Sequence, residues 1–263
     1  MSLKKKEKYI PVQPLVGEGT DYNVYNATVK EKAAWFLIGM LVSGAVLYIF
    51  YENIFVSIIV GAICGIFFVP LRKKQVINKR KKRLTAQFRG LLDALGTSIG
   101  AGKNMFDSFT GAEEDLAVQF TPEADIVKEV RLIRIGLDNN IGIEDLLLNF
   151  AERSGIDDVR NFANVFATCY KKGGNIKDVI KNTTSIIGDK IEIQMELETM
   201  VAGQKNEQNI MLVMPVVFII VLKSMGGDLI DLKSPVGIIS VTAAIAIFIL
   251  AYFISKRILN IKL

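Results

Sequence analysis

The stretch of sequence with the most suggestive chemistry runs from Ser98 to Phe109 and contains the letters GAGKN. A phosphate-binding loop carries a glycine five residues before its second glycine, and a hydroxyl directly after its lysine to hold Mg²⁺. Those two places hold Thr97 and Asn104. The preceding segment, 84–99, has helical periodicity, whereas a phosphate-binding loop follows a strand. We therefore predict that Lys103 is not a nucleotide ligand.

Composition limits other catalytic chemistries. The 263 residues include no histidine, so the usual general base and the commonest transition-metal ligand are both missing. Cys64 and Cys169 lie far apart in the sequence, which argues against a disulfide framework. An acidic loop could in principle hold Mg²⁺ or Ca²⁺, although solvated acids are the simpler interpretation: Glu113, Glu114, Asp115, Glu123 and Asp125. We expect no enzyme activity, no cofactor and no metal ligand.

Hydropathy predicts a membrane protein. Hydrophobic residues make up 51% of the chain and its mean hydropathy is +0.35, values too apolar for an ordinary soluble domain. Four membrane spans are predicted: Ala33–Phe50, Ile54–Leu71, Ile210–Leu222 and Pro235–Ile254. The third has only about 13 apolar residues, or ~20 Å of helix against a hydrocarbon core of ~30 Å. It must therefore borrow length from Asn209 and from Lys223 to Gly226.

A basic segment, 72–83, follows the second span and contains no acid. Because positive charge is enriched on the cytoplasmic side, we expect this segment, the central region and both termini to be cytoplasmic in a multi-pass protein of the cell (inner) membrane. The residues predicted to set topology and to contact anionic lipid headgroups are Arg72, Lys73, Lys74, Lys79, Arg80, Lys81, Lys82 and Arg83. Nucleic-acid binding is not expected, because no aromatic side chains interleave these charges.

Small residues recur within the first two spans. Gly39 with Ser43, and Ser57 with Gly61 and Gly65, are spaced so that two helix backbones could approach closely, although glycine is also generally tolerated in membrane helices. A membrane transporter or channel component is an alternative for the whole chain. Such a protein would carry ionisable residues or broken helices inside its spans, whereas the polar groups here are small and Pro215 is the only break.

The central region, 84–209, has helical patterns throughout, and Leu84, Phe88, Leu91, Leu92, Leu95 and Ile99 share one face. A repeat at a spacing in the thirties predicts corners between helices, in which a left-handed glycine ends one helix and an aspartate lies near the positive end of the next. The corner residues are Gly102 and Asp107, Gly142 and Asp145, and Gly173 and Gly174 with Asp178. After Asn175 the pattern predicts one long helix up to Pro215.

These features predict an all-α polytopic membrane protein in which two transmembrane helical hairpins flank a cytoplasmic helical bundle. The expected divisions are a cytoplasmic N-terminal segment at 1–32, a first hairpin at 33–71, a basic linker at 72–83, a helical domain at 84–209, a second hairpin at 210–254 and a tail at 255–263. We interpret the first span as a retained helix rather than a cleaved signal, because a polar leader of about thirty residues precedes it.

The segments AGKNMFDSF, NNIGIEDLLLNFAERSG and YKKGGNIKDVI, set between a basic linker and a terminal membrane hairpin, resemble the type II secretion system F domain. The resemblance covers Leu84 to Leu222, and Lys172–Ile180 is its most specific part. A single such domain between two hairpins is similar to the TadB/TadC-like platform proteins of tight-adherence pilus systems. The resemblance implies a membrane scaffold that is not an enzyme.

The partners that the resemblance implies are a cytoplasmic secretion ATPase, a paralogous platform protein or a second copy of the chain, and a pilin or pseudopilin. Membrane lipids are expected partners from the basic segment. A mixed-charge surface at two neighbouring corners is the predicted contact with the ATPase, although ordinary solvated helix faces would have the same composition. Its residues are Lys128, Arg131, Arg134, Asp138, Glu152, Arg153, Asp157, Asp158 and Arg160.

Overall fold

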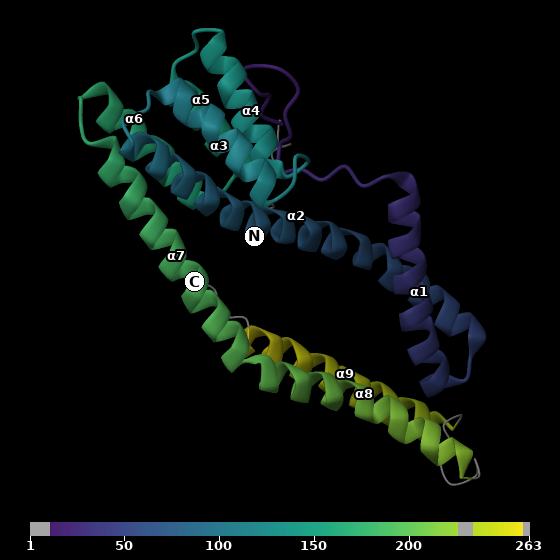
Figure 1. Cartoon of the computed structure of the whole chain (residues 1–263). Helices are drawn as coiled ribbons and strands as arrows, with labels where there is room; N and C mark the ends of the chain where they lie inside the picture. Colours follow the sequence, from purple (N-terminus) through teal and green to yellow (C-terminus); the bar gives the residue numbers. More distant parts are fainter. Residues whose placement is uncertain (1–10, 226–233, 260–263) are drawn as a thin grey trace, which may run out of the picture. The chain divides into compact units, whose positions relative to one another are not determined.

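The computed structural model describes residues 11–225 and 234–259, and within these ranges every regular element is an α-helix (Figure 1). The helices are α1 (Val29–Tyr51), α2 (Ile54–Gly100), α3 (Met105–Gln119), α4 (Asp125–Asp138), α5 (Ile143–Ser154), α6 (Asp157–Lys171), α7 (Ile176–Met200), α8 (Ala202–Ser224) and α9 (Pro235–Leu259). The prediction of an all-α fold is confirmed for the described residues. The loop between α8 and α9 that was predicted to close a hairpin lies outside them.

The chain divides into two compact units. The bundle unit contains the described residues up to Asn26, together with Gln75–Glu192. The apolar unit contains Ala27–Lys74 and the described residues from Ile193 onward. Helix α2 begins in the apolar unit and ends in the bundle unit, so one helix contributes to both.

Among the residues that the structure describes, three helices are long and apolar enough to cross a membrane: α1, α2 and α8. Large apolar side chains on them are exposed, including Leu41, Phe67 and Met211, as expected for surfaces that face lipid. The helix that holds the short third apolar run is longer than the run itself: α8 begins at Ala202, and its 23 residues give about 35 Å of helix. Helix α9 holds a shorter apolar stretch, Gly237–Tyr252.

Helix α2 is continuous over 47 residues, so the basic segment 72–83, predicted as a linker, is helical. Lysine and arginine are good helix formers, and Pro70 does not interrupt the helix. The expected single helix after Asn175 is divided instead, because Val201 separates α7 from α8. The amide of Val201 still bonds to the carbonyl of Leu197, and its carbonyl accepts the amide of Lys205, so the interruption is confined to one residue.

The core of the bundle forms around the predicted apolar face of α2. Leu84, Phe88, Leu91, Leu92 and Leu95 are fully buried, and Ile99 packs against them. The Phe88 ring meets the Phe162 ring of α6 edge to face at 5.5 Å between centroids, and the Phe150 ring of α5 lies 6.2 Å away. The helical period of 3.6 residues predicted the apolar face of α2. The same residues form the part of α2 that is buried in the core with α3 to α7.

The helix corners differ in part from the predicted glycine pattern. Gly102 and Gly173 have φ values of +83° and +69°, the left-handed conformation that glycine adopts without strain. Gly142 has a φ of −60° and precedes α5 as its N-cap, so the prediction for it is wrong. Asn140, with a φ of +60°, takes the left-handed role there, as asparagine can. The φ angle of Gly174 is not positive, so this glycine is not left-handed.

The aspartates of the predicted repeat lie in the first turns of their helices: Asp107 in α3, Asp145 in α5 and Asp178 in α7. Two of them also take part in capping. Asn104 accepts the amide of Asp107 at 2.8 Å and donates to its carboxylate at 2.7 Å, and Asn175 donates to Asp178 at 2.6 Å. The GAGKN stretch is therefore the end of α2 followed by the N-cap of α3.

Close backbone packing joins α1 to the apolar part of α2. A Cβ atom on Gly39 would lie 2.8 Å from the Cβ of Phe68, and one on Gly65 would lie 2.9 Å from the backbone oxygen of Phe36. A Cβ on Gly61 would lie 3.1 Å from the oxygen of Met40. Two small hydroxyls complete the set: Ser43 donates to the carbonyls of Gly39 and Gly61 at 2.6 and 3.4 Å, and Ser57, which is buried, donates to the carbonyl of Asn53 at 2.9 Å.

Replacing Gly65 with leucine is expected to destabilise the apolar unit, because the new Cβ would press on the backbone of Phe36, which cannot rotate away. Overpacking of this kind costs about 1–3 kcal/mol. The measurement is thermal unfolding of the full chain in detergent, with Cys64→Leu at the neighbouring exposed position as the matched control. Equal melting temperatures for the two variants would contradict close packing of these helices.

Candidate functional site

The predicted ATPase-binding residues fall into three groups in the structure. Lys128, Glu152, Asp157 and Arg160 are exposed on α4, α5 and α6, where a partner could reach them. Arg131, Arg134, Asp138 and Asp158 are engaged in ion pairs within the bundle. Arg153 is only 2% exposed, so its assignment to a binding surface is wrong.

Glu113 on α3 receives two arginines from α4. The Nε atoms of Arg131 and Arg134 lie 2.7 and 2.8 Å from its two carboxylate oxygens, and Arg134 also lies 3.6 Å from Asp138. Partial burial opposes ionisation of Glu113, but hydrogen bonds and charges from both arginines outweigh it and lower the pKa of the carboxyl. These residues hold α3 against α4, and the loop expected around Glu113 is instead part of a helix.

A second pair joins α6 to α7. The Lys190 ammonium lies 3.0 Å from both carboxylate oxygens of Asp158, which is mostly shielded from solvent. The carboxylate therefore has an internal cation at hydrogen-bonding distance. Asp158 contributes to helix packing at the corner where a partner surface was predicted.

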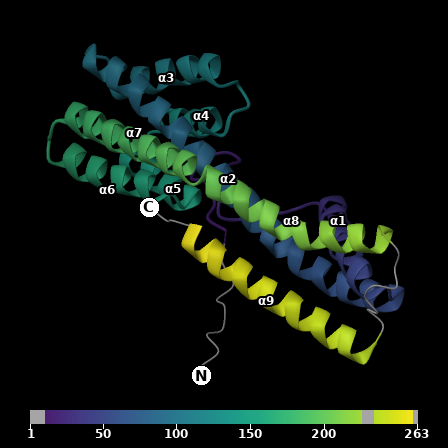
Figure 2. The same cartoon turned by 90° about the horizontal axis from the view of Figure 1, so that it is seen from below.

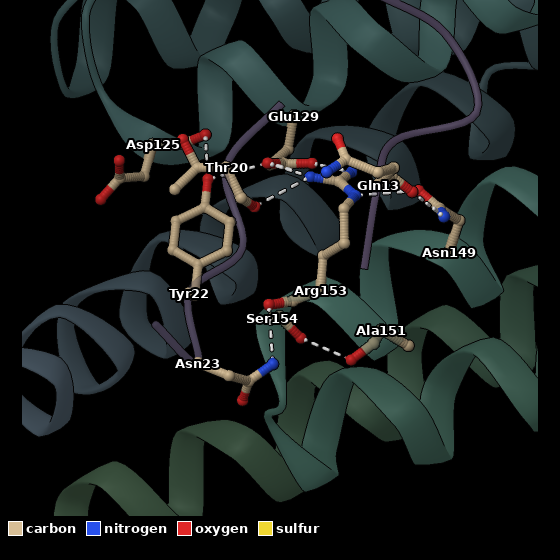
Figure 3. Close-up of polar contacts among 10 residues, drawn as sticks. All are labelled: Gln13, Thr20, Tyr22, Asn23, Asp125, Glu129, Asn149, Ala151, Arg153 and Ser154. Carbon is tan, nitrogen blue, oxygen red and sulfur yellow. Dashed lines mark hydrogen bonds and ion pairs between the residues drawn. The ribbon is translucent and has the colours of Figure 1, made fainter. Parts of the chain in front are cut away.

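Arg153 is the centre of a buried polar cluster (Figure 3). Its guanidinium donates to both carboxylate oxygens of Glu129 on α4, in the bidentate geometry that arginine and a carboxylate favour. Its remaining N–H groups reach Asn149 at 2.8 Å and the carbonyl of Thr20 at 3.2 Å. Glu129 is only 1% exposed, so both charges of this pair are removed from water.

A strap of non-helical chain, residues 11–26, completes this cluster and is connected to α4 and α5 by hydrogen bonds. Tyr22 donates its hydroxyl to Glu129 at 2.8 Å and its amide to the carbonyl of Arg153 at 2.9 Å. Asn23 donates to the same carbonyl at 3.2 Å, and Asn149 donates to the carbonyl of Gln13 at 2.9 Å. Burial and then the nearby Glu129 carboxylate raise the pKa of the Tyr22 hydroxyl, so it stays protonated and remains a donor.

Sequence reasoning missed the strap, since it was described only as a polar leader. A local signal was present, because Asp21 organises a turn by accepting the amides of Asn23 and Val12 at 2.8 and 3.0 Å. Aspartate commonly makes turns of this kind with a backbone amide two residues ahead. The partners of the strap in α4 and α5 lie more than 100 residues later in the sequence, so no local pattern predicts these contacts.

The C-terminal end of the basic segment lies beside the strap. Arg80 and Arg83 bind Asp125 at 2.6 and 3.0 Å, and the Arg80 guanidinium lies 4.7 Å from the centre of the Tyr22 ring. Lys81 donates to Asn23 at 2.6 Å, and also to the carbonyl of residue 155. Internal groups therefore bind these three cations, although 64% of the Arg83 side chain stays exposed, and their contact with lipid headgroups stays a prediction.

Asp125 shows how strongly those arginines act. Burial opposes its ionisation, but the hydrogen bonds and charges of Arg80 and Arg83 hold the pKa of its carboxyl below the usual value. Asp125 is also the first residue of α4. For the other basic residues, contact with lipid headgroups stays a prediction: Arg72, Lys73, Lys74, Lys79 and Lys82.

Many charged groups of the bundle bind one another or the strap, and these contacts hold the helices and the strap in place. Lys103 and Gly102 are exposed at the corner between α2 and α3. Within the described part of the chain, no three or more cysteine, aspartate or glutamate side chains group in a way that could hold a metal ion. Of the five acids weighed as a cation site, Glu113 and Asp125 are bound by arginines.

Comparisons with protein-family models, with curated proteins and with solved structures found no match to this chain. The resemblance to the secretion F domain therefore rests on the motifs in the sequence. What it implies about partners and activity stays a prediction.

Replacing Glu129 with alanine is expected to lower the free energy of unfolding by about 3–5 kcal/mol, because it leaves the Arg153 charge buried without its partner. Tyr22→Phe should cost less, about 1.5–3 kcal/mol, because it removes one hydrogen bond to a charged group. Denaturant unfolding of the full chain in detergent measures both, and hydrogen exchange at the Tyr22 amide reports release of the strap. Glu114→Ala, at an exposed position of α3, is the control. A loss for Glu129→Ala no larger than for the control would refute the structural importance of this pair.

Proposed function

We propose that this chain is a non-enzymatic platform protein of the cell membrane that couples a cytoplasmic secretion ATPase to pilin assembly or secretion, in a type II secretion or tight-adherence pilus machine. The sequence motifs that resemble the F domain support this assignment. The structure adds a compatible architecture of apolar helices and a helical bundle. The proposal also includes the arrangement of two membrane hairpins with a cytoplasmic bundle.

The observation that carries the proposal is the continuity of α2. Its first part, from Ile54 to Leu71, is apolar and long enough to reach through a hydrocarbon core, and its last turns supply the centre of the bundle from Leu84 onward. No loop separates the two parts. A scaffold that transmits partner-driven motion requires a continuous covalent and helical connection of this kind.

Polar contacts at the ends of α1 and α8 support the proposed topology. The Lys223 ammonium lies 2.8 Å from the Glu52 carboxylate and donates to the carbonyl of Ile49 at 2.6 Å. These residues lie at the C-terminal ends of the two helices, so both ends belong on the same side of a membrane. With the basic segment 72–83 in the cytoplasm, that side is the outside of the cell.

Single cysteines test this topology in a Cys64→Ser, Cys169→Ser background. We expect Asn53→Cys and Ser234→Cys to react in intact cells with a thiol reagent that cannot cross membranes, because both positions follow or precede apolar helices on the outer side. Asn104→Cys, at the exposed corner of the bundle, should react only after the cells are permeabilised. Labelling of Asn104→Cys alone in intact cells would contradict the proposed orientation.

The exposed charges of the bundle are the proposed contact with the ATPase. Lys128 on α4 and Arg160 on α6 are better candidates than Arg131 and Arg134, because Glu113 binds the latter two. Reversible contacts between proteins are generally more polar than permanent ones, which suits a partner that changes shape with its nucleotide. Exposed charges would accelerate association without fixing the complex permanently.

Full-length protein in nanodiscs should bind the secretion-type ATPase encoded in the same genome, and the association rate should fall as salt rises through ~0.15 M, where the screening length is about 8 Å. Lys128→Glu combined with Arg160→Glu should slow association roughly tenfold or more at low salt. The matched control is Lys171→Glu combined with Lys172→Glu, at exposed positions at the far end of α6. Rates indifferent to salt and to charge reversal would exclude electrostatic docking, and absence of any binding would overturn the platform function.

A further inference from the structure

A groove of about 570 Å³ lies between α8 and α9, inside the apolar unit. The two helices run side by side in both views of the chain (Figures 1 and 2). Its volume is within the range of about 300–1,000 Å³ that is usual for sites of small ligands. Such sites combine mostly apolar walls with a few polar groups that orient the ligand.

The lining of this groove changes from polar to apolar along its length. Gln204, Glu207 and Gln208 lie in the first two turns of α8, and Ser255 lies in the last turns of α9. Met211 and Leu212 on α8, with Phe248 and Ala251 on α9, make up most of the remaining wall. One end therefore suits a polar headgroup and the other suits a hydrocarbon chain.

One group at the polar end is a buried donor without a partner, and a second is an exposed carboxylate. The side-chain nitrogen of Gln208 is buried and has no hydrogen-bond partner among the described residues. A buried donor without a partner costs about 1–3 kcal/mol, so a ligand that accepts its hydrogen bond gains affinity. Glu207 adds a carboxylate at the edge of an apolar stretch, a setting in which ionisable residues usually serve a function.

We propose that this groove binds a phospholipid whose headgroup carries an amine, such as phosphatidylethanolamine. The Glu207 carboxylate pairs with the ammonium of the headgroup, and the Gln208 amide donates to a phosphate or ester oxygen. One acyl chain lies along Met211, Phe248 and Ala251. An anionic lipid without an amine leaves Glu207 facing like charge and binds less tightly.

Native mass spectrometry of the full chain in detergent tests this assignment, with phosphatidylethanolamine and phosphatidylglycerol added in equal amounts. Wild-type protein should retain the amine lipid about tenfold more than the glycerol lipid, as expected for one charge-assisted hydrogen bond. Glu207→Gln should abolish that preference. Glu196→Gln, an exposed position of α7 that does not line the groove, should retain it.

Filling the groove with a larger side chain provides an independent test of the proposal. Ala251→Trp should reduce the binding of both lipids, whereas Ala246→Trp, on the same helix but outside the groove, should leave binding unchanged. The proposal is overturned if wild-type protein binds the two lipids equally, or if Ala251→Trp retains as much lipid as wild type. A change of oligomeric state in Ala251→Trp without loss of lipid would assign the groove to a helix of a second copy instead.

Discussion

The buried ion pair between Glu129 and Arg153 imposes the most demanding constraint on the bundle. Two charges removed from water are stable only when their remaining donors and acceptors are also bonded. Asn149, the carbonyl of Thr20 and the hydroxyl of Tyr22 meet that need. The register of α4 against α5 and the path of the strap are therefore specified together. An apolar pair could fill the same space but would not select one position of the strap.

The apolar unit is organised by a different requirement. Helices surrounded by lipid gain little from hydrophobic burial, so they associate through close backbone contact and through polar links. Gly39 and Gly65 allow the first kind of contact between α1 and α2. Lys223 supplies the second kind by binding Glu52 and the carbonyl of Ile49. Hydropathy identifies Lys223 only as the end of a span. Its contacts nevertheless determine which helix ends lie together.

The sequence predicted the structure correctly where the helical period of neighbouring residues determines it. The face of α2 around Leu84 and the aspartates at helix starts follow from helical geometry alone. The run of charge at 72–83 is typical of a linker, but lysine and arginine also favour helices, and the segment is helical. Arg153 could not be placed, because its partner Glu129 is 24 residues away and neighbouring exposed charges look the same. The left-handed residue at Asn140 was missed because a glycine two positions later matched the expected pattern.

The position of the strap in the chain determines the order in which contacts can form during synthesis. Residues 11–26 leave the ribosome before α1 and α2, yet Tyr22 bonds to Glu129 and Arg153, more than 100 residues later. The segment must therefore stay undocked while α1 and α2 are being made. Docking becomes available only once α4 and α5 have been made, so an early-synthesised segment closes the bundle late. Between the synthesis of α5 and the docking of the strap, the Arg153 and Glu129 charges lack some of their native partners and are prone to non-native contacts.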